Sequence, residues 1–380
     1  MVTERLRRAI AAQKDAGLHR SPVTIEKYEG SHVVVDGTPL INFASNDYLG
    51  LAQNEAWQQT VAECFAKHPP SGTSSRLVTG HSSFTEEAEQ RFAEFFGYDE
   101  CLFLPSGYQA NLAIVWGLCG PSETLFIDKR IHASMAQGLA QTGSPVHGFA
   151  HSNLKQLDSK LTNKNANSPI VLTESLFSMD GDLLDIKTFT ALKAKHNFFS
   201  IIDEAHSFGA LGENGTGICQ SCADVAVGTF GKALGMFGAF VLMPKGFKEF
   251  FHNFSSPVIY STAMPEAHAA AAVALLKILP ELEEQRAHLS AISSLLHSEL
   301  RNAGFIVHGD AHIAAVEIGN EMRAAKIAEG MREDGVLAFA ARHPTVPMNK
   351  AVIRISMTAL HSTADVHTLV SSIRGWYDRT

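Results

Sequence analysis

A single lysine, Lys232, stands in segment 227–235 (VGTFGKALG), whose other residues are apolar, small or hydroxyl-bearing. Burying an ammonium group without a nearby carboxylate disfavours its charged form and lowers the pKa of the lysine. An amine with a lowered pKa is a nucleophile that can condense with an aldehyde and can remove a proton. We therefore expect Lys232 to be buried and to carry covalent catalysis.

Asp203 and His206 belong to the sequence DEAH, which follows an apolar run. The same four letters form a metal-binding box in helicases, but a helicase also needs a G-x-x-x-x-G-K-[ST] phosphate loop, which this sequence lacks. A carboxylate at a strand end, with a histidine three residues later, could instead bind the pyridinium nitrogen and the phenolic oxygen of pyridoxal phosphate (PLP). Lys232 would then be the Schiff-base lysine.

Hydroxyl groups and a helix start could bind the phosphate of that cofactor. Segment 106–108 (SGY) ends an apolar run and is predicted to open a helix, whose free N–H groups suit an anion. Ser178 and Thr229 are hydroxyls at other strand ends, and His132 could lay its ring on the pyridine. Each residue alone has an ordinary explanation as a cap, a turn or a structural histidine. The prediction depends on their recurrence at successive strand ends.

Alternating strands and helices between residues 85 and 245 would position these side chains. Apolar runs of strand length occur at 101–107, 124–128, 169–175, 198–206, 223–232 and 238–244. They alternate with helical patterns, which predicts a mostly parallel sheet covered by helices on both faces. Ligands bind such sheets at the carboxyl ends of the strands, so we expect the candidate residues along one edge.

The chain of 380 residues is expected to form three parts. We expect a helix and a hairpin in residues 1–45, the large α/β domain in residues 46–287, and a smaller α+β domain in residues 288–380. From residue 266 onward the pattern predicts helices at 266–285, 290–304, 323–335 and 364–379, with strands at 313–319 and 351–359.

Composition excludes several classes of protein. The net charge of -8 gives no basic face for nucleic acid. No run of about 18 apolar residues predicts a membrane span, and the charged amino terminus lacks a secretory signal, so we expect a cytoplasmic protein. The five cysteines include a C-x-x-C at 219–222, but a zinc site would need a second pair, so we expect no metal.

Nine segments together resemble the α-oxoamine synthases, which are PLP enzymes of fold type I, and the resemblance runs from end to end. These segments are NFASNDYLGL (42–51), SGTSSRLVTG (71–80), SGYQAN (106–111), TESLFSMDGD (173–182), DEAHSFGALGENGTG (203–217), TFGKALG (229–235), YSTAMP (260–265), HPTVP (343–347) and IRISMTALH (353–361). The resemblance implies an α/β fold with a large, mostly parallel seven-stranded sheet domain and a smaller α+β carboxyl-terminal domain.

The resemblance also implies a role for each matching position. Lys232 would bond to the cofactor, Asp203 would pair with the pyridine nitrogen, His206 would contact the phenolic oxygen and His132 would stack on the ring. The residues expected around the phosphate are Gly107, Tyr108, Ser178 and Thr229, with Ser261 and Thr262 reaching the site of the other subunit in a homodimer. Those expected to bind substrate are Arg354 and Asn46 at the amino-acid carboxylate, for which a planar guanidinium is well shaped, and Thr345 and Arg20 at the acyl group.

The implied reaction joins L-alanine to pimeloyl-CoA with loss of coenzyme A and carbon dioxide. Sister enzymes that join glycine to acetyl-CoA or succinyl-CoA, or serine to a long acyl-CoA, share these motifs. An acyl-carrier-protein thioester in place of the CoA ester, and a non-catalytic PLP-binding partner subunit, are further alternatives. The sequence departs from its relatives at PPSGTSSR (69–76), where GSGGSR is common, and at Met236 and Phe237, where smaller residues are common.

Overall fold

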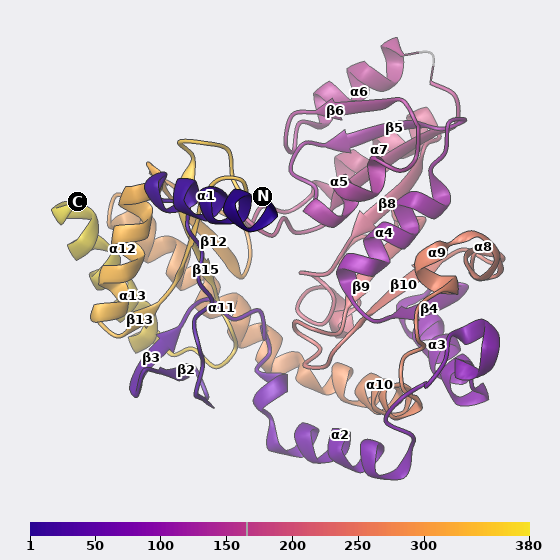
Figure 1. Cartoon of the computed structure of the whole chain (residues 1–380), viewed down its shortest axis with the longest axis horizontal. Helices are drawn as coiled ribbons and strands as arrows, with labels where there is room; N and C mark the ends of the chain where they lie inside the picture. Colours follow the sequence, from indigo (N-terminus) through magenta and orange to yellow (C-terminus); the bar gives the residue numbers. More distant parts are fainter. Residues whose placement is uncertain (165) are drawn as a thin grey trace. The chain divides into compact units, whose positions relative to one another are not determined.

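The computed structural model describes residues 1–164 and 166–380, which form two compact units (Figure 1). The first unit comprises Met1–Gln53, Ser178–Asp182 and Ala287–Thr380, and the second comprises Asn54–Phe177 and Leu183–Arg286. Each unit is described by itself.

A seven-stranded sheet forms the centre of the second unit, in the order β4-β10-β9-β8-β7-β5-β6. Its strands are β4 (Glu100–Leu104), β5 (Thr124–Asp128), β6 (Val146–Phe149), β7 (Pro169–Glu174), β8 (Phe199–Asp203), β9 (Val225–Thr229) and β10 (Ala239–Met243). Neighbours from β9 to β6 are parallel, whereas β10 runs antiparallel to both β4 and β9. The mostly parallel sheet is therefore confirmed, and β6 is a strand that the sequence pattern did not predict.

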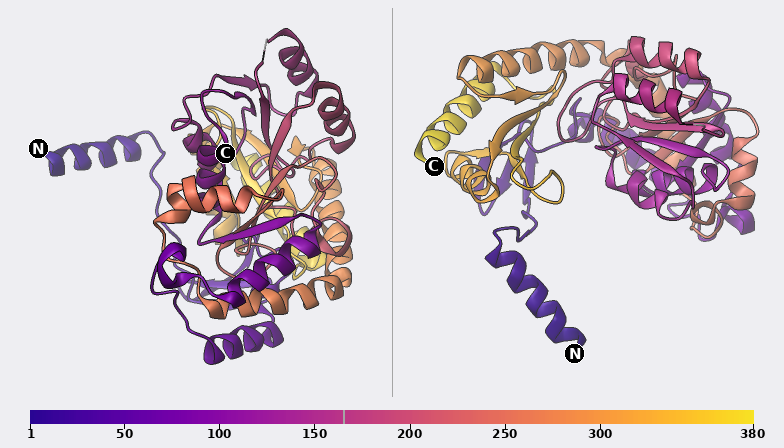
Figure 2. Two further views of the ribbon diagram at one scale, coloured as in Figure 1. Left: turned by 90° about the vertical axis from the view of Figure 1, so that its right-hand side faces the viewer. Right: turned by 90° about the horizontal axis from the view of Figure 1, so that it is seen from above.

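Helices cover both faces of this sheet (Figure 2). The helices of this unit are α2 (Glu55–Lys67), α3 (Ser83–Phe96), α4 (Gly107–Leu118), α5 (Ala133–Leu139), α6 (Leu154–Asn163), α7 (Ile186–His196), α8 (Phe247–Phe254), α9 (Ser256–Ile259) and α10 (Glu266–Ile278). The side chains of β4 pack against helices on both faces of the sheet, because successive side chains of a strand point to opposite sides. Leu102 and Leu104 belong to one apolar cluster with Ile114 of α4, whereas Phe103 packs edge-to-face on Phe92 of α3.

A buried cluster of charges ties α3 and α8 to strand β4. Arg76 pairs with Glu89, and the Lys248 Nζ lies 2.6 Å from Glu89 Oε2. Glu89 Oε1 also accepts the backbone N–H of Phe103 at 2.6 Å. Burial alone raises the pKa of the Glu89 carboxyl, but the charges of Arg76 and Lys248 outweigh it and hold this pKa below its usual value. Glu89 is therefore an ionised group that depends on its two cations.

Two small sheets form the centre of the first unit. One has the order β1-β2-β3-β13 and the other β11-β12-β15-β14. Their strands are β1 (Lys27–Glu29), β2 (His32–Val35), β3 (Thr38–Asn42), β11 (Val307–His308), β12 (Ile313–Gly319), β13 (Val336–Leu337), β14 (Phe339–Ala341) and β15 (Ala351–Ser356). The helices of this unit are α1 (Val2–Asp15), α12 (Glu321–Glu333), α13 (Thr363–Arg379) and, from Ala287 onward, α11 (Glu283–Asn302). Helix α1 and the antiparallel pair β2 and β3 lie within residues 1–45, where the sequence predicted a helix and a hairpin.

The predicted helices at 266–285 and 290–304 have different boundaries in the structure. Helix α10 ends at Ile278, a 3-10 turn covers Leu279–Leu282, and α11 (Glu283–Asn302) runs through the expected break at 286–289. Pro280 explains the difference, because a proline ring clashes with the preceding turn and provides no backbone N–H. The chain therefore breaks at Pro280, several residues earlier than predicted.

No helix in the described part of the chain combines the length and the apolarity that a membrane crossing requires.

Candidate active site

The carboxyl ends of β4, β5, β8 and β9 lie at one edge of the sheet in the second unit. Strands β5, β8 and β9 share one direction, and β4 shares it too, because β4 and β9 are both antiparallel to β10. Helix α4 begins at Gly107 just beyond β4, Asp203 ends β8, and Thr229 ends β9. The sheet thus brings Gly107, Asp203 and Thr229 to one edge.

Asp203 is a buried carboxylate held by two hydrogen bonds. Its Oδ1 accepts the backbone N–H of Ala205 at 2.9 Å, and its Oδ2 accepts a hydrogen from Asn111 Nδ2 at 2.7 Å. Asn111 lies on α4 and is buried. These two bonds fix the plane of the carboxylate at the end of β8.

His132 precedes α5 and is connected to Asp203 through two further side chains. Its Nδ1 lies 2.7 Å from Ser134 Oγ, and it also accepts the backbone N–H of Ser134 at 3.3 Å. Asn111 Nδ2, which donates to Asp203, lies 3.0 Å from the same Ser134 Oγ. Asn111 and Ser134 therefore join two of the predicted catalytic residues, although neither was itself predicted.

The electrostatics of His132 place Lys232 in the same group. The imidazole has an exposed face, yet desolvation by the surrounding chain lowers its pKa. The charge of Lys232 lowers this pKa further, and the charge of Asp203 opposes the shift. His132 thus interacts electrostatically with two of the other three predicted catalytic residues, Asp203 and Lys232.

Lys232 is half-buried in the second unit, which corrects the expectation that it is buried. The chain turns after β9, where the Phe230 ring is buried, and this turn leaves Gly231 exposed and Lys232 half-exposed. Beyond the turn, Met236 is half-buried and Phe237 is exposed. The sequence could not show this, because the exposure of a short loop depends on how the chain leaves its strand.

Two distant side chains anchor the loop that carries Lys232. The Trp57 indole N–H donates to the carbonyl of Gly235 at 3.3 Å, and His268 Nε2 lies 2.5 Å from the carbonyl of Phe237. Burial lowers the pKa of His268 to about 4, so the imidazole is neutral and donates through Nε2. Both hydrogen bonds hold the part of the loop that follows Lys232.

The start of α4 faces the hydroxyl of Thr229. A Cβ built at Gly107 would lie 3.9 Å from Thr229 Oγ1, so glycine leaves room between the helix and this side chain. Thr229 Oγ1 donates to the carbonyl of Gly238 at 3.0 Å and accepts the N–H of Gly231 at 3.1 Å. The first N–H groups of a helix have no acceptor within it, so they suit a phosphate.

Tyr108 and Ser261 also lie beside the first turn of α4. The ring of Tyr108 is edge-on to His132 with 6.5 Å between centroids. Gln109 Nε2 donates to Ser261 Oγ at 2.5 Å and to the carbonyl of Pro257 at 2.8 Å. Thr262, next to Ser261, is exposed and pairs through its backbone with Ser75.

His206 is buried in the turn that follows β8. The same turn holds Glu204, whose fully buried carboxyl accepts the N–H groups of Ile218 at 2.8 Å and Cys219 at 3.1 Å. Burial raises the pKa of Glu204 to about 7, and its hydrogen bonds oppose this shift. Glu204 closes the loop that carries His206.

Arg354 is a buried cation in β15 of the first unit. Its Nε donates to the carbonyl of Ser178 at 2.5 Å, its Nη1 to Ser356 Oγ at 2.6 Å and its Nη2 to Asn46 Oδ1 at 3.2 Å. The hydroxyl of Tyr48 also donates to Asn46 Oδ1, at 3.1 Å. Burial raises the pKa of Tyr48 to about 12, and the nearby charge of Arg354 opposes this.

The guanidinium of Arg354 therefore contacts neutral oxygens, and among the residues that the structure describes no carboxylate pairs with it. Asn46 and Arg354 are hydrogen-bonded to each other, and their role at the amino-acid carboxylate stays a prediction. Ser178 lies in the first unit with its carbonyl on Arg354, so its role at the phosphate stays a prediction. Arg20 donates to the carbonyl of His343 at 3.1 Å, and Thr345 is exposed two residues beyond, so their role toward the acyl group also stays a prediction.

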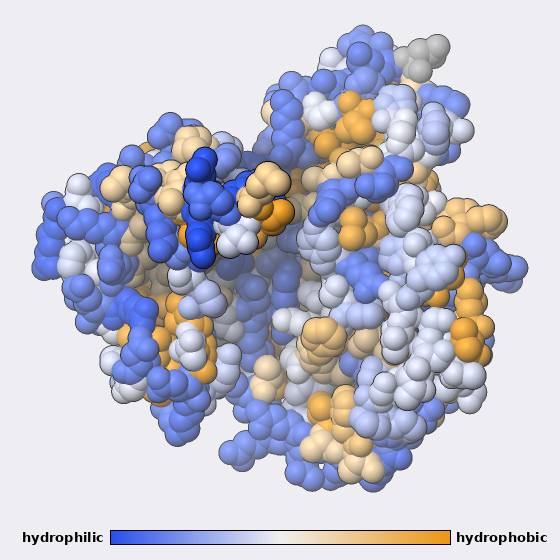
Figure 3. Space-filling model, in the orientation of Figure 1, coloured by the Kyte–Doolittle hydropathy of each residue, from blue (hydrophilic) through white to orange (hydrophobic). Residues whose placement is uncertain are grey.

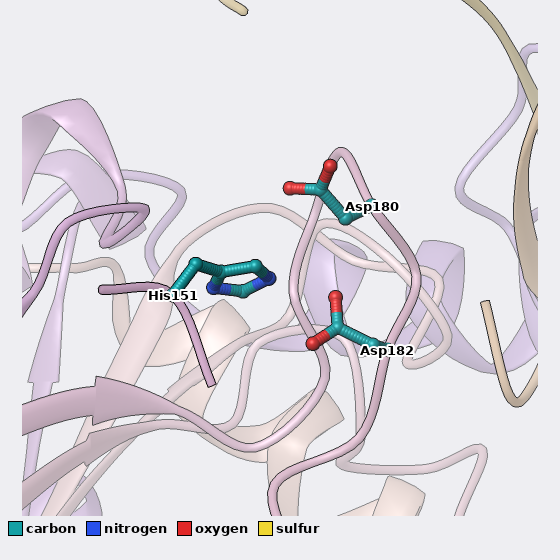
Figure 4. A group of neighbouring side chains, drawn as sticks. All are labelled: His151, Asp180 and Asp182. Carbon is teal, nitrogen blue, oxygen red and sulfur yellow. The ribbon is translucent and has the colours of Figure 1, made fainter. Parts of the chain in front are cut away.

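Figure 4 shows His151, Asp180 and Asp182, whose side chains are of kinds that can bind metals. The two aspartates belong to segment Ser178–Asp182 of the first unit, whereas His151 belongs to the second unit. Within its own unit, His151 Nδ1 lies 3.1 Å from Asp128 Oδ1, and its ring is edge-on to Phe177. We assign no metal to these side chains.

Comparisons with known proteins show the family to which this chain is related. Residues 38–373 match the family model of aminotransferase class I and II. An 8-amino-7-oxononanoate synthase from Pseudomonas syringae pv. tomato is 34% identical over 383 residues, which cover 98% of this chain and 96% of the relative. A putative 8-amino-7-oxononanoate synthase from Bacillus cereus is 32% identical over 362 residues, which cover 93% of this chain and 92% of the relative.

Solved structures resemble the fold over almost the whole chain. A serine palmitoyltransferase from S. paucimobilis with a bound PLP–myriocin aldimine has a TM-score of 0.91 and 26% identity, covering 98% of this chain and 97% of the other. An 8-amino-7-oxononanoate synthase from Francisella tularensis has a TM-score of 0.77 and 27% identity, and the match covers 88% of this chain and 97% of the other.

Proposed function

This chain belongs to the aminotransferase class I and II family and within it to the PLP-dependent α-oxoamine synthases, and we propose that it condenses L-alanine with pimeloyl-CoA or another pimeloyl thioester. The products would be 8-amino-7-oxononanoate, coenzyme A and carbon dioxide, which places the enzyme in biotin biosynthesis. The relatives that carry the name 8-amino-7-oxononanoate synthase support this choice, at 34% identity over 98% of the chain.

The residues at the sheet edge fit PLP. Asp203 would bind the pyridine nitrogen, His132 would cover one face of the ring, and Lys232 would bond to the aldehyde carbon. The helix start at Gly107 and the Thr229 hydroxyl would hold the phosphate, because the room between them lacks a side chain. When bound, PLP supplies a ring that accepts the electron pair released at Cα of the amino acid.

The observation that carries the proposed function is the unpaired charge of Arg354. A buried guanidinium costs free energy unless an anion compensates it, and the described residues around it are neutral. The carboxylate of an amino acid would supply that anion and match the planar donor group. Asn46 and Ser356 hold the guanidinium plane, so the substrate would bind in one orientation.

Lys232 would then move the proton at Cα of alanine. A neutral amine is the base that this step needs, and the cationic form must release its proton first. Removal of the proton makes Cα the nucleophile that attacks the thioester carbonyl, and coenzyme A leaves as the thiol. Carbon dioxide is then lost from the carboxylate of the condensed product, and a proton takes its place at Cα.

A homodimer would complete the site. Leu77, Val78 and Tyr260 are apolar or aromatic side chains that are 56%, 72% and 81% exposed, and they flank the bridge between Ser75 and Thr262. Figure 3 shows further apolar side chains at the surface over α8, and Phe254 of this helix is 71% exposed. Covering these side chains with a second copy would bring Ser261 and Thr262 to the phosphate of that copy. Light scattering should give the mass of two chains.

The second candidate is the condensation of serine with a long acyl-CoA. The similarity to serine palmitoyltransferase, with a TM-score of 0.91 over 98% of the chain, favours it. Condensations of glycine with acetyl-CoA or succinyl-CoA use the same kinds of residue. The structure supports the common chemistry more strongly than any one pair of substrates.

Isotope labelling tests the proposed function. The enzyme with PLP is supplied with pimeloyl-CoA and L-alanine that carries ¹³C in its carboxyl group, and mass spectrometry follows both products. We expect unlabelled 8-amino-7-oxononanoate and labelled carbon dioxide. A condensed product that keeps the label would contradict decarboxylation. Turnover with serine and palmitoyl-CoA alone would support the second candidate, and no turnover with any pair would indicate a non-catalytic subunit.

A further inference from the structure

Four side chains of the second unit form one line of hydrogen bonds from Asp203 to His132. Asn111 Nδ2 lies 2.7 Å from Asp203 Oδ2 and 3.0 Å from Ser134 Oγ, and Ser134 Oγ lies 2.7 Å from His132 Nδ1. Asn111 and Ser134 are buried between the two residues that would contact the cofactor ring. They do not reach the reacting atoms themselves.

The chemistry of these groups gives the line one direction. An amide nitrogen carries two hydrogens and an ionised carboxylate carries none, so Asn111 Nδ2 donates to Asp203. The opposite orientation of the amide would place two acceptor oxygens 2.7 Å apart, which is repulsive. The second amide hydrogen faces Ser134 Oγ, so the hydroxyl hydrogen of Ser134 is left for His132 Nδ1.

The backbone fixes the tautomer of His132. The N–H of Ser134 lies 3.3 Å from His132 Nδ1, and a backbone N–H is always a donor. Nδ1 is therefore an acceptor, and the proton of the neutral imidazole is on Nε2. Both the hydroxyl and the backbone N–H of Ser134 hold the ring in this form.

We propose that Asn111 is a positioning residue that, with Ser134, links Asp203 to His132 and sets the orientation of both side chains and the tautomer of His132 toward the PLP ring. This inference needs PLP as the cofactor but does not depend on which substrates are condensed. The amide donor would hold the Asp203 carboxylate in the orientation in which it can pair with the pyridine nitrogen.

The surroundings of Asn111 support this positioning role for its amide. Its buried neighbours along α4 are Ala110, Ile114 and Val115, so an apolar side chain would suit the core. Asn111 Oδ1 is buried and accepts no hydrogen bond from the described residues, which costs free energy. The bonds of Nδ2 to Asp203 and Ser134 offset that cost, and they are the reason for a polar residue at this position.

Replacing Asn111 by leucine tests the link to Asp203, because leucine has a similar size and no donor. Without the donor, the Asp203 carboxylate loses one of the two hydrogen bonds that hold its plane. Loss of a hydrogen bond to a charged group should weaken PLP binding roughly tenfold or more.

A variant that keeps the amide separates this role from a merely structural one. PLP is titrated into the cofactor-free protein, and its visible absorbance gives the dissociation constant. We expect Asn111→Gln, which keeps an amide donor, to bind PLP more tightly than Asn111→Leu. An unchanged affinity in Asn111→Leu, or equal affinities of the two variants, would overturn the proposal. Ile114→Leu, an apolar change on the same helix, is the matched control.

Ser134→Ala tests the other link and keeps the proposal falsifiable if Asn111→Leu does not fold. Hydrogen bonds that donate to Nδ1 favour the neutral imidazole, so losing the hydroxyl should raise the pKa of His132. NMR of histidine labelled with ¹³C at Cε1 measures this pKa in the PLP-bound enzyme, with His132→Gln used to assign the signal. We expect a rise in Ser134→Ala and none in the exposed control Ser122→Ala. A pKa of His132 that stays constant or falls would refute the link.

Discussion

Replacing Arg354 by lysine should weaken amino-acid binding without removing the cofactor. The guanidinium is buried in β15 and held by the carbonyl of Ser178, the hydroxyl of Ser356 and the amide oxygen of Asn46. Lysine keeps the positive charge but loses the planar fork that can hold both carboxylate oxygens at once. The variant therefore isolates geometry from charge.

The size of the effect follows from the contacts of the guanidinium. A hydrogen bond to a charged group contributes about 1.5–3 kcal/mol, and lysine retains at most one of the two bonds that a carboxylate would receive. Each 1.4 kcal/mol corresponds to about a tenfold change in an equilibrium constant. We expect the KM for L-alanine to rise about 10- to 100-fold.

Steady-state release of coenzyme A measures this KM at saturating pimeloyl-CoA. The visible absorbance of bound PLP and the KM for pimeloyl-CoA should stay close to those of the wild type, because the proposed contacts of Arg354 are with the amino acid alone. Arg323→Lys is the control, since Arg323 lies over the Tyr377 ring on the surface of the first unit. A wild-type KM for alanine in Arg354→Lys would refute the carboxylate role.

Three further predictions concern Lys232, Glu89 and Glu204. Lys232→Ala should abolish turnover and the visible absorbance of lysine-bound PLP while leaving the circular dichroism spectrum unchanged, because Lys232 is only half-buried. Glu89→Gln leaves the buried charges of Arg76 and Lys248 uncompensated and should lower the free energy of unfolding by about 3–5 kcal/mol in urea titrations. Burial raises the pKa of Glu204 from 4.5 to about 7, so its carboxyl stabilises the fold below its unfolded pKa, and this contribution is lost as pH rises through the folded pKa. Between about pH 4.5 and 8 the free energy of unfolding of the wild type should fall by about 3 kcal/mol more than that of Glu204→Gln. Equal pH dependence of the free energy of unfolding in the two proteins would contradict the raised pKa of Glu204.

The sequence pattern predicted the central sheet because its strands are long apolar runs. The run at 124–128 is β5, and β7 begins at Pro169 as predicted. The strands that were not predicted are short: β6 has four residues, β1 and β14 have three each, and β11 and β13 have two each. So few residues give no measurable alternation, and each of these strands is defined by its pairing with a longer neighbour.

The candidate site could be predicted where a strand end and a reactive side chain coincide, as at Asp203 and Thr229. Asn111 and Ser134 were not predicted, although Asn111 belongs to the motif SGYQAN that supported the family resemblance. Asn111 and Asp203 are 92 residues apart in the sequence, and their hydrogen bond depends on the packing of α4 against the sheet. A polar residue on the apolar face of a predicted helix was the one signal that could have identified Asn111.

The most direct test of the proposed reaction is a coenzyme A release assay that crosses three amino acids with four thioesters. L-Alanine, glycine and L-serine are each combined with pimeloyl-, acetyl-, succinyl- and palmitoyl-CoA, and kcat/KM is measured for every pair with the PLP-bound enzyme. We expect the highest value for L-alanine with pimeloyl-CoA. A higher kcat/KM for any other pair would contradict the proposed function.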